Sequence, residues 1–214
     1  MSDKRLLLLD FDGVIADTFH IAHGIAKRMC VYLTETEYRK RHDGNIYESD
    51  KAALAADHGD RCDHALDWLG EYTPVFKMHA RPFEGMPEQV KEFARTYTLC
   101  IVSSGHNALI EEFLTTYGIR ELIDGVYGME VNTRKDEKFK MIFSKYGIAP
   151  EQTVFITDTL GDVNEATSVG LSSIGVTWGF QDRKTLARGN PFAIVDTPQE
   201  LPAAVADYFA SREL

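Results

Sequence analysis

The sequence is poor in cysteine and in positive charge. Of its 214 residues only three are cysteines, and the wide spacing of Cys30, Cys62 and Cys100 argues against a disulfide framework or a cysteine-rich zinc site. Lysine and arginine total 23 against 33 aspartates and glutamates, which gives a formal net charge of −10. Nucleic acids and anionic membrane surfaces bind basic proteins, so neither is an expected partner of so acidic a chain.

Long apolar runs are also missing. The apolar stretch near the N-terminus, at 6–9, is too short for a signal peptide or a membrane span. With no export signal, the expected location is the cytoplasm.

Five short apolar runs predict the strands of a sheet. They lie at 6–9, 99–102, 154–156, 172–176 and 192–195. Continuous apolar runs without polar alternation are typical of strands buried on both faces. Segments with helical periodicity occur between them, at 86–97, 107–117, 135–146 and 161–169. Strands that alternate with helices predict a parallel sheet in an α/β fold.

The region from about 18 to 80 breaks this alternation. It contains helical signals but no strand run, and six of the seven histidines fall within it. The region contains too many aromatic residues to be interpreted as a linker. We therefore expect a helical insert of roughly 60 residues between the first two core strands.

Carboxylates follow two of the predicted strands. Asp10 and Asp12 come after the first strand, and Asp158 follows the third, with Asp162 one helical turn further on. Strand ends meet at one edge of a parallel sheet, where ligands bind. Because clustered carboxylates repel one another, a cation is the natural partner, and an all-oxygen ligand set favours Mg²⁺.

Other polar groups belong to the same edge. Ser103 and Ser104 precede a glycine at a helix start, an arrangement typical of phosphate binding. On the helix from 135, Lys135 projects onto the apolar stripe and should meet an anion. Lys138 projects roughly 90° away and is expected to be solvated.

These motifs resemble those of the haloacid dehalogenase superfamily, most members of which are Mg²⁺-dependent phosphatases. The segment from Asp10 to Thr18 is similar to the first motif, and Val102-Ser103-Ser104-Gly105 to the second. Lys135 fits the third motif, and Asp158-Thr159-Leu160-Gly161-Asp162 the fourth.

The resemblance implies a fold. The catalytic core, at 1–17 and 82–214, would be a Rossmann-like doubly wound parallel sheet. The insert at 18–81 would be a small α-helical cap domain, like that of the phosphoglycolate phosphatase and β-phosphoglucomutase branch. Within it, Gly44, Asn45 and Tyr47 lie in a segment that resembles the substrate-specificity loop of that branch.

The resemblance also implies a mechanism. Asp10 would be the nucleophile, Asp12 the general acid and base, and Lys135 the cation beside the transferring phosphoryl group. Ser103 and Ser104 would hold the phosphate. Mg²⁺ would be held by the Asp10 carboxylate, the Asp12 carbonyl and Asp158, with Asp162 close by.

The expected function is therefore hydrolysis of a small phosphorylated metabolite, as in phosphoglycolate phosphatase. A β-phosphoglucomutase-like phosphotransferase is the main alternative, and a receiver-like phosphorylation switch without turnover is a weaker one. The oligomeric state is left open. Several insert and core residues are further candidates to face the site: His20, Arg41, His42, Asn45, Tyr47, Lys51 and His106.

Overall fold

A six-stranded parallel sheet forms the centre of the protein. The computed structural model describes residues 5–48, 62–63 and 65–212. The strand order is β5-β4-β1-β6-β7-β8, and the strands run parallel to their neighbours. Their bounds are β1 Leu6–Leu9, β4 Thr98–Val102, β5 Gly125–Tyr127, β6 Thr153–Thr157, β7 Ser172–Val176 and β8 Ala193–Val195.

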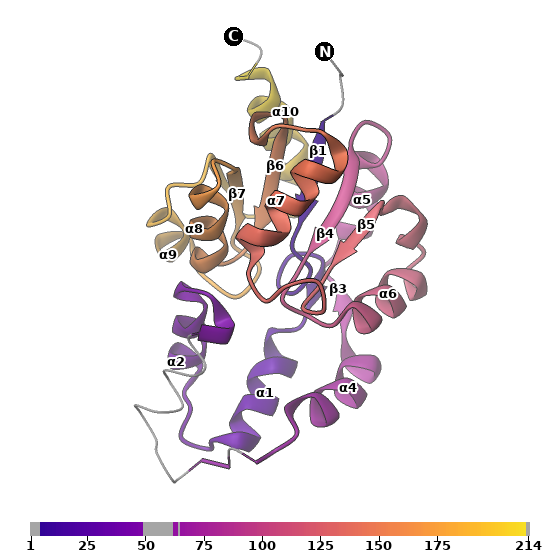
Figure 1. The fold of residues 1–214 in the computed structure, drawn as a ribbon. Coiled ribbons are helices and arrows are strands. Elements are labelled where there is room, and N and C mark those ends of the chain that lie inside the picture. The colour runs from indigo at the N-terminus through magenta and orange to yellow at the C-terminus, as the bar shows by residue number, and fades with distance from the viewer. Residues whose placement is uncertain (1–4, 49–61, 64, 213–214) are drawn as a thin grey trace.

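Helices cover both faces of this sheet (Figure 1). They are α5 Met86–Phe93, α6 Asn107–Thr116, α7 Lys135–Tyr146, α8 Leu160–Ser168, α9 Arg183–Ala187 and α10 Leu201–Ala210, with short 3₁₀ turns η3 Arg120–Leu122, η4 Pro150–Gln152 and η5 Pro198–Glu200. Side chains of β1 alternate between the two layers. Leu7 and Leu9 pack in the cluster that includes α5, α6 and α10, whereas Leu6 and Leu8 pack with α7 and α8.

The α/β fold predicted from the sequence is confirmed. The five predicted strands are present within one residue of their expected bounds. Strand β5 was not predicted from the sequence, because it has only three residues and two of them are half-buried, so no continuous apolar run marks it.

A second group of helices lies at the lower end of Figure 1, below the sheet. It comprises α1 Phe19–Met29, α2 Glu35–Lys40, the 3₁₀ turn η1 Arg41–Asp43 and α4 Trp68–His79, which we call the helical insert. The strands β2, Ala16–Asp17, and β3, Arg81–Pro82, pair antiparallel where the chain enters and leaves it. We propose this pair as the boundary between a core, at 1–17 and 82–214, and a cap at 18–81.

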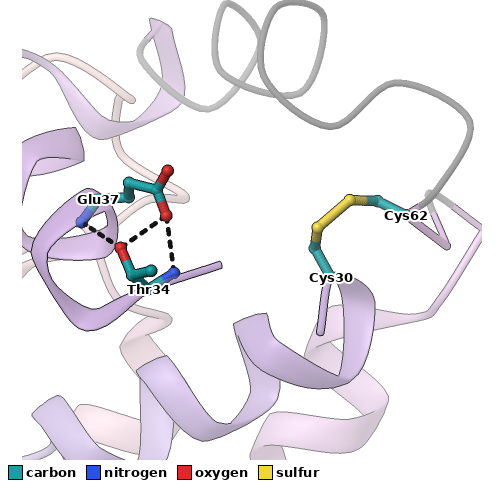
Figure 2. Close-up of a disulfide and its surroundings, with 4 residues drawn as sticks. All are labelled: Cys30, Thr34, Glu37 and Cys62. Carbon is teal, nitrogen blue, oxygen red and sulfur yellow. Dashed lines mark hydrogen bonds between the residues drawn. A yellow bond between two sulfur atoms is a disulfide. The ribbon is translucent and has the colours of Figure 1, made fainter. Parts of the chain in front are cut away.

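A disulfide between Cys30 and Cys62 links the end of α1 to the segment before α4 (Figure 2). The spacing of the cysteines argued against a disulfide framework, and it did not predict this single bond. Two cysteines 32 positions apart meet because α1 and α4 pack against each other, a contact that spacing alone does not reveal. Cys100 is free and buried in β4.

Figure 2 also shows how α2 begins. Thr34 accepts a hydrogen bond from the Glu37 backbone N–H, and the Glu37 carboxylate accepts from the Thr34 backbone N–H at 2.8 Å. This capping box satisfies backbone donors that the first helical turn leaves without partners.

Within the described segments, the helices are too short or too polar to span a membrane.

Candidate active site

The sheet changes direction at β1. From β1 the chain proceeds outward through β4 and β5 on one side and through β6, β7 and β8 on the other. Ligands of open α/β sheets bind in the crevice at this point, beyond the carboxyl ends of the strands. Asp10, Ser103 and Asp158 each come directly after one of the three central strands.

Lys135 connects two of the predicted carboxylates. Its Nζ lies 2.6 Å from Asp10 Oδ2 and 2.7 Å from Asp162 Oδ2, and all three side chains are nearly inaccessible to solvent. Asp162 accepts a further hydrogen bond from Thr157 Oγ1 at 2.8 Å. The helical phase of α7 therefore placed Lys135 correctly on the core face.

The charges of this cluster depend on one another. Burial raises the pKa of Asp10 above its usual range, and the Lys135 ammonium opposes that rise. Burial also disfavours the charged form of Asp162, but the attraction of the Lys135 ammonium and the side-chain hydrogen bonds of Asp162 together outweigh it and lower the pKa of Asp162 to about 2. The Lys135 pKa is raised despite burial, because two carboxylates surround it. Lys135 therefore supplies the positive charge that this cluster needs.

Lys138 is not solvated, and the prediction from helical phase was wrong. The side chain is fully buried, and its Nζ donates to the Ser103 carbonyl at 2.6 Å. Burial lowers the pKa of Lys138 to about 8. The position of Lys138 on the helix predicted the direction of its side chain. It did not predict that the loop after β4 would cover that side chain. Lys138 thus supports the backbone of the predicted phosphate-binding segment.

Asp12 lies in a different set of contacts from Asp10. Its Oδ1 accepts from Thr18 Oγ1 at 2.7 Å and from Tyr72 Oη at 3.5 Å, and its Oδ2 accepts from Ser103 Oγ at 3.4 Å. Burial raises the pKa of Asp12, although these hydrogen bonds oppose the shift. Tyr72, from α4, is a site residue that the sequence analysis missed, because only the fold brings it within reach of Asp12.

Asp158 is fully buried but only half satisfied. Its Oδ2 accepts from the Phe180 backbone N–H at 2.6 Å, whereas Oδ1 has no hydrogen-bond partner. Burial raises the pKa of Asp158 to about 7. Gly13, with φ +76°, packs against this carboxylate so closely that a Cβ would lie 1.9 Å from Oδ2. Only glycine fits at that position of the loop.

The second motif forms a compact turn after β4. Ser103 is fully buried, and its Oγ accepts from the Gly105 backbone N–H at 2.9 Å. Ser103 and Ser104 both line the cavity described below, beside Asp10 and Asp12. The arrangement suits a phosphate held by hydroxyl and backbone N–H groups.

The predicted specificity loop contacts the core directly. Asn45 Nδ2 donates to the Thr133 carbonyl at 3.1 Å and to Glu165 Oε1 at 3.0 Å. Tyr47 Oη donates to the Ser104 carbonyl at 2.5 Å. Gly44 touches Gly161 so closely that a Cβ at Gly161 would lie 2.3 Å from the Gly44 carbonyl oxygen. The helical insert is therefore closed over the core.

Glu165 and Gln181 are two further residues that form hydrogen bonds between the helical insert and the core, and neither was predicted from the sequence. Glu165 accepts from the Lys135 backbone N–H at 3.2 Å as well as from Asn45. Gln181 donates to the Arg39 carbonyl at 3.0 Å and to Asp43 Oδ1 at 2.9 Å. Polar residues in loops carry no periodic signal, so only the closed structure shows their partners.

A cavity of about 540 Å³ lies between the helical insert and the core. Its core end contains the carboxylate cluster, and its other end reaches α1 and α4. Of the further candidates, Arg41, His42, Tyr47 and His106 line it. His20 is exposed and does not line it, Asn45 makes the core contacts given above, and Lys51 lies outside the described residues.

The carboxylate cluster fits a small hard cation. Asp158 Oδ1 is a buried acceptor without a donor, and the Asp10 carboxylate lines the same cavity. Among the residues described, no group of three or more His, Cys, Asp or Glu side chains forms a metal-binding cluster. Mg²⁺ is commonly held by one or two carboxylates together with waters and substrate phosphate.

Comparison with known proteins gives the family. The sequence profile of the haloacid dehalogenase-like hydrolases matches residues 7–176. This range contains the four motifs, from Asp10 to Asp162. The chain therefore belongs to the haloacid dehalogenase-like hydrolases and is an enzyme of that family.

Individual relatives point the same way. The chain is 30% identical over 138 residues to a phosphoglycolate phosphatase of Synechococcus elongatus, across 64% of this chain and 63% of the relative. It thus spans less than two thirds of that protein. Identity to the probable phosphatase IndB of Dickeya dadantii is 25% over 225 residues, across 94% of this chain and 93% of IndB.

A solved structure has the same fold. It is a haloacid dehalogenase-like family protein from Streptococcus pneumoniae, with a TM-score of 0.77 and 21% identity. The match covers 96% of this chain and 100% of the other. The doubly wound sheet with its helical insert is therefore a known architecture.

Proposed function

We propose that this protein is a Mg²⁺-dependent phosphoric monoester hydrolase that acts on a small phosphorylated metabolite, as phosphoglycolate phosphatases do. The observation that carries the proposal is that the carboxylates of Asp10 and Asp12 have different hydrogen-bond partners. Asp10 is paired with Lys135 at the end of β1, whereas Asp12 points to Thr18, Tyr72 and Ser103. These different contacts support attack by Asp10 and proton transfer by Asp12.

The proposed reaction has two steps. An Asp10 carboxylate oxygen attacks phosphorus, the bond to the leaving oxygen breaks, and Asp12 gives that oxygen a proton. Asp12 then accepts a proton from water, which attacks the aspartyl-phosphate, so phosphate leaves and Asp10 is restored. Lys135 balances the charge beside Asp10 throughout. Ser103 and Ser104 hold the phosphate oxygens in both steps.

The metal would be held by the Asp10 carboxylate, the Asp12 backbone carbonyl and Asp158. Asp162 would lie close to the metal without binding it directly, because its Oδ2 accepts hydrogen bonds from Lys135 and Thr157. Bound Mg²⁺ supplies charge stabilisation for the transferring phosphoryl group.

Removal of the metal is expected to abolish turnover. After exhaustive chelation, phosphate release should fall to background, and added Mg²⁺ should restore it. Ca²⁺ should inhibit, because it takes about 6–8 oxygen ligands at longer distances and can engage both Asp10 oxygens. Phosphate release is the measurement, and full activity in the chelated protein would contradict the proposed metal site.

Substitutions in the predicted specificity loop are expected to have two different effects. Asn45→Ala loses two hydrogen bonds to the core, so kcat/KM should fall by about ten-fold for every ester alike. Tyr47 also lines the cavity, so Tyr47→Ala should change the ratio of kcat/KM between two metabolites of different size. Steady-state kinetics on both metabolites and on p-nitrophenyl phosphate measures this. An equal loss on all three with Tyr47→Ala would assign Tyr47 to closure alone.

A screen of phosphorylated metabolites with Mg²⁺ tests the proposed function. At least one ester should release inorganic phosphate, and the Asp10→Asn protein should release none. Formation of an isomeric phosphate instead of inorganic phosphate would indicate a mutase. A reducing cytoplasm, the proposed location, keeps cysteines as thiols. The screen is therefore run both without a thiol reductant, where Cys30 and Cys62 are joined in a disulfide, and with one, where both are thiols.

A further inference from the structure

The far end of the cavity, away from the carboxylates, has an apolar lining. Ala22, Ala26 and Met29 face it from α1 at spacings of four and three residues, which places them on one side of that helix. Trp68 and Leu69 face it from the first turn of α4. We call these five side chains the insert wall. The Trp68 ring also stacks on Tyr72, with centroids 4.4 Å apart.

Positive charge is scarce in the part of the cavity lining that the structure describes. Lys135 is bound between Asp10 and Asp162, and burial lowers the pKa of His42 to about 4, so His42 is neutral at pH 7. His106 lies 2.9 Å from a Glu130 oxygen. Arg41 is the remaining cationic side chain of the described lining, and its guanidinium lies 6.0 Å from the Tyr38 ring centroid.

Three described polar side chains of the cavity lining already have partners. Tyr47 Oη donates to the Ser104 carbonyl, and Tyr72 Oη to Asp12. Asp67 Oδ1 accepts from the Gly70 backbone N–H at 3.1 Å, and its charge repels an anion. These three side chains therefore offer a sugar or a carboxylate little in exchange for the hydrogen bonds to water that it would lose.

From this lining we infer that the alcohol part of the substrate is an uncharged apolar group, alkyl or aromatic, which binds in preference to glycolate or a sugar. The inference rests on the proposed function, because it places the phosphoryl group at Asp10 and the alcohol against the insert wall. A cavity of about 540 Å³ is larger than a two-carbon acid requires and lies within the usual range for ligands of drug size.

A series of alkyl phosphates tests this directly. Ethyl, butyl and hexyl phosphate have similar leaving groups, so differences in kcat/KM report contacts of the chain. Each buried methylene is expected to raise kcat/KM by about four-fold. Hexyl phosphate should therefore exceed ethyl phosphate by well over ten-fold, and should also exceed 2-phosphoglycolate and glucose 6-phosphate.

Two variants of the insert wall locate the effect. Ala26→Leu narrows the cavity and should lower kcat/KM for hexyl phosphate by about ten-fold, with ethyl phosphate affected much less. Lys27→Leu adds an apolar side chain at the next, exposed position of α1 and should change neither ester more than about two-fold. Leu69→Gln, at a partly exposed position, should reduce the ratio of hexyl to ethyl phosphate without disturbing the core.

Binding separates this inference from the proposed function. The Asp10→Asn protein should bind hexyl phosphate more tightly than 2-phosphoglycolate by about ten-fold or more, measured as Kd by calorimetry. If this order of Kd held but the parent protein turned over none of the esters, the proposed function would be overturned and the inference about the alcohol group would stand. A flat alkyl series, or tighter binding and faster turnover of 2-phosphoglycolate or glucose 6-phosphate, would overturn the inference while the phosphatase proposal stood.

Discussion

The Asp12→Asn protein is expected to release about one equivalent of p-nitrophenol from p-nitrophenyl phosphate in a rapid burst, and then to turn over slowly. A general acid or base is worth roughly 10²–10⁴ in rate. p-Nitrophenolate is a good leaving group and scarcely needs the acid, so the first step should survive. Hydrolysis of the aspartyl-phosphate needs the base and should become limiting.

Asparagine suits this experiment because it keeps the shape of Asp12 and can still accept from Thr18 and Tyr72. Asp17→Asn, at an exposed acid of β2, is the matched control and should behave as the parent. Stopped-flow absorbance measures the burst. Unimpaired steady turnover in Asp12→Asn would contradict the proposed role of Asp12.

The Lys135→Ala protein should lose about 10²–10³ in kcat, the loss typical of removing one electrostatic contact to a transferring group. Its ammonium is the positive charge closest to Asp10 and Asp162, and without it these carboxylates repel the incoming phosphoryl group. The pair is buried, so the variant should also be less stable. Kinetics are therefore measured well below the melting temperature of the variant.

Lys140→Ala is the control on the same helix. Lys140 is exposed and pairs with Glu137, so its loss should leave kcat within about two-fold of the parent. If Lys135→Ala were as active as Lys140→Ala, the ion pairs of Lys135 would be structural, and the transferring phosphoryl group would be stabilised elsewhere.

The core of the site was predictable because its residues occupy positions that the fold dictates. A parallel sheet brings the ends of its central strands to one edge, so Asp10, Ser103 and Asp158 could be placed together from strand runs alone. The phase of α7 added Lys135. These predictions needed only local periodicity and the direction of the strands.

The remainder of the site depends on contacts between distant segments. Tyr72 reaches Asp12 across 60 residues, and Cys30 meets Cys62 only because α1 and α4 pack together. Lys138 was misplaced for the same reason, since the loop that buries it comes from a different part of the chain. Such contacts form only when the insert packs on the core, and the spacing of residues in the sequence does not reveal them.

The most direct test of the proposed mechanism is to locate the trapped phosphoryl group. The Asp12→Asn protein is mixed with p-nitrophenyl phosphate, quenched in acid during the slow phase and digested, and the peptides are analysed by mass spectrometry. We expect one phosphoryl group per chain, on Asp10 in the peptide that follows β1, and none in the Asp10→Asn protein. A phosphoryl group on any other residue, or its presence in Asp10→Asn, would contradict the assignment of Asp10 as the nucleophile.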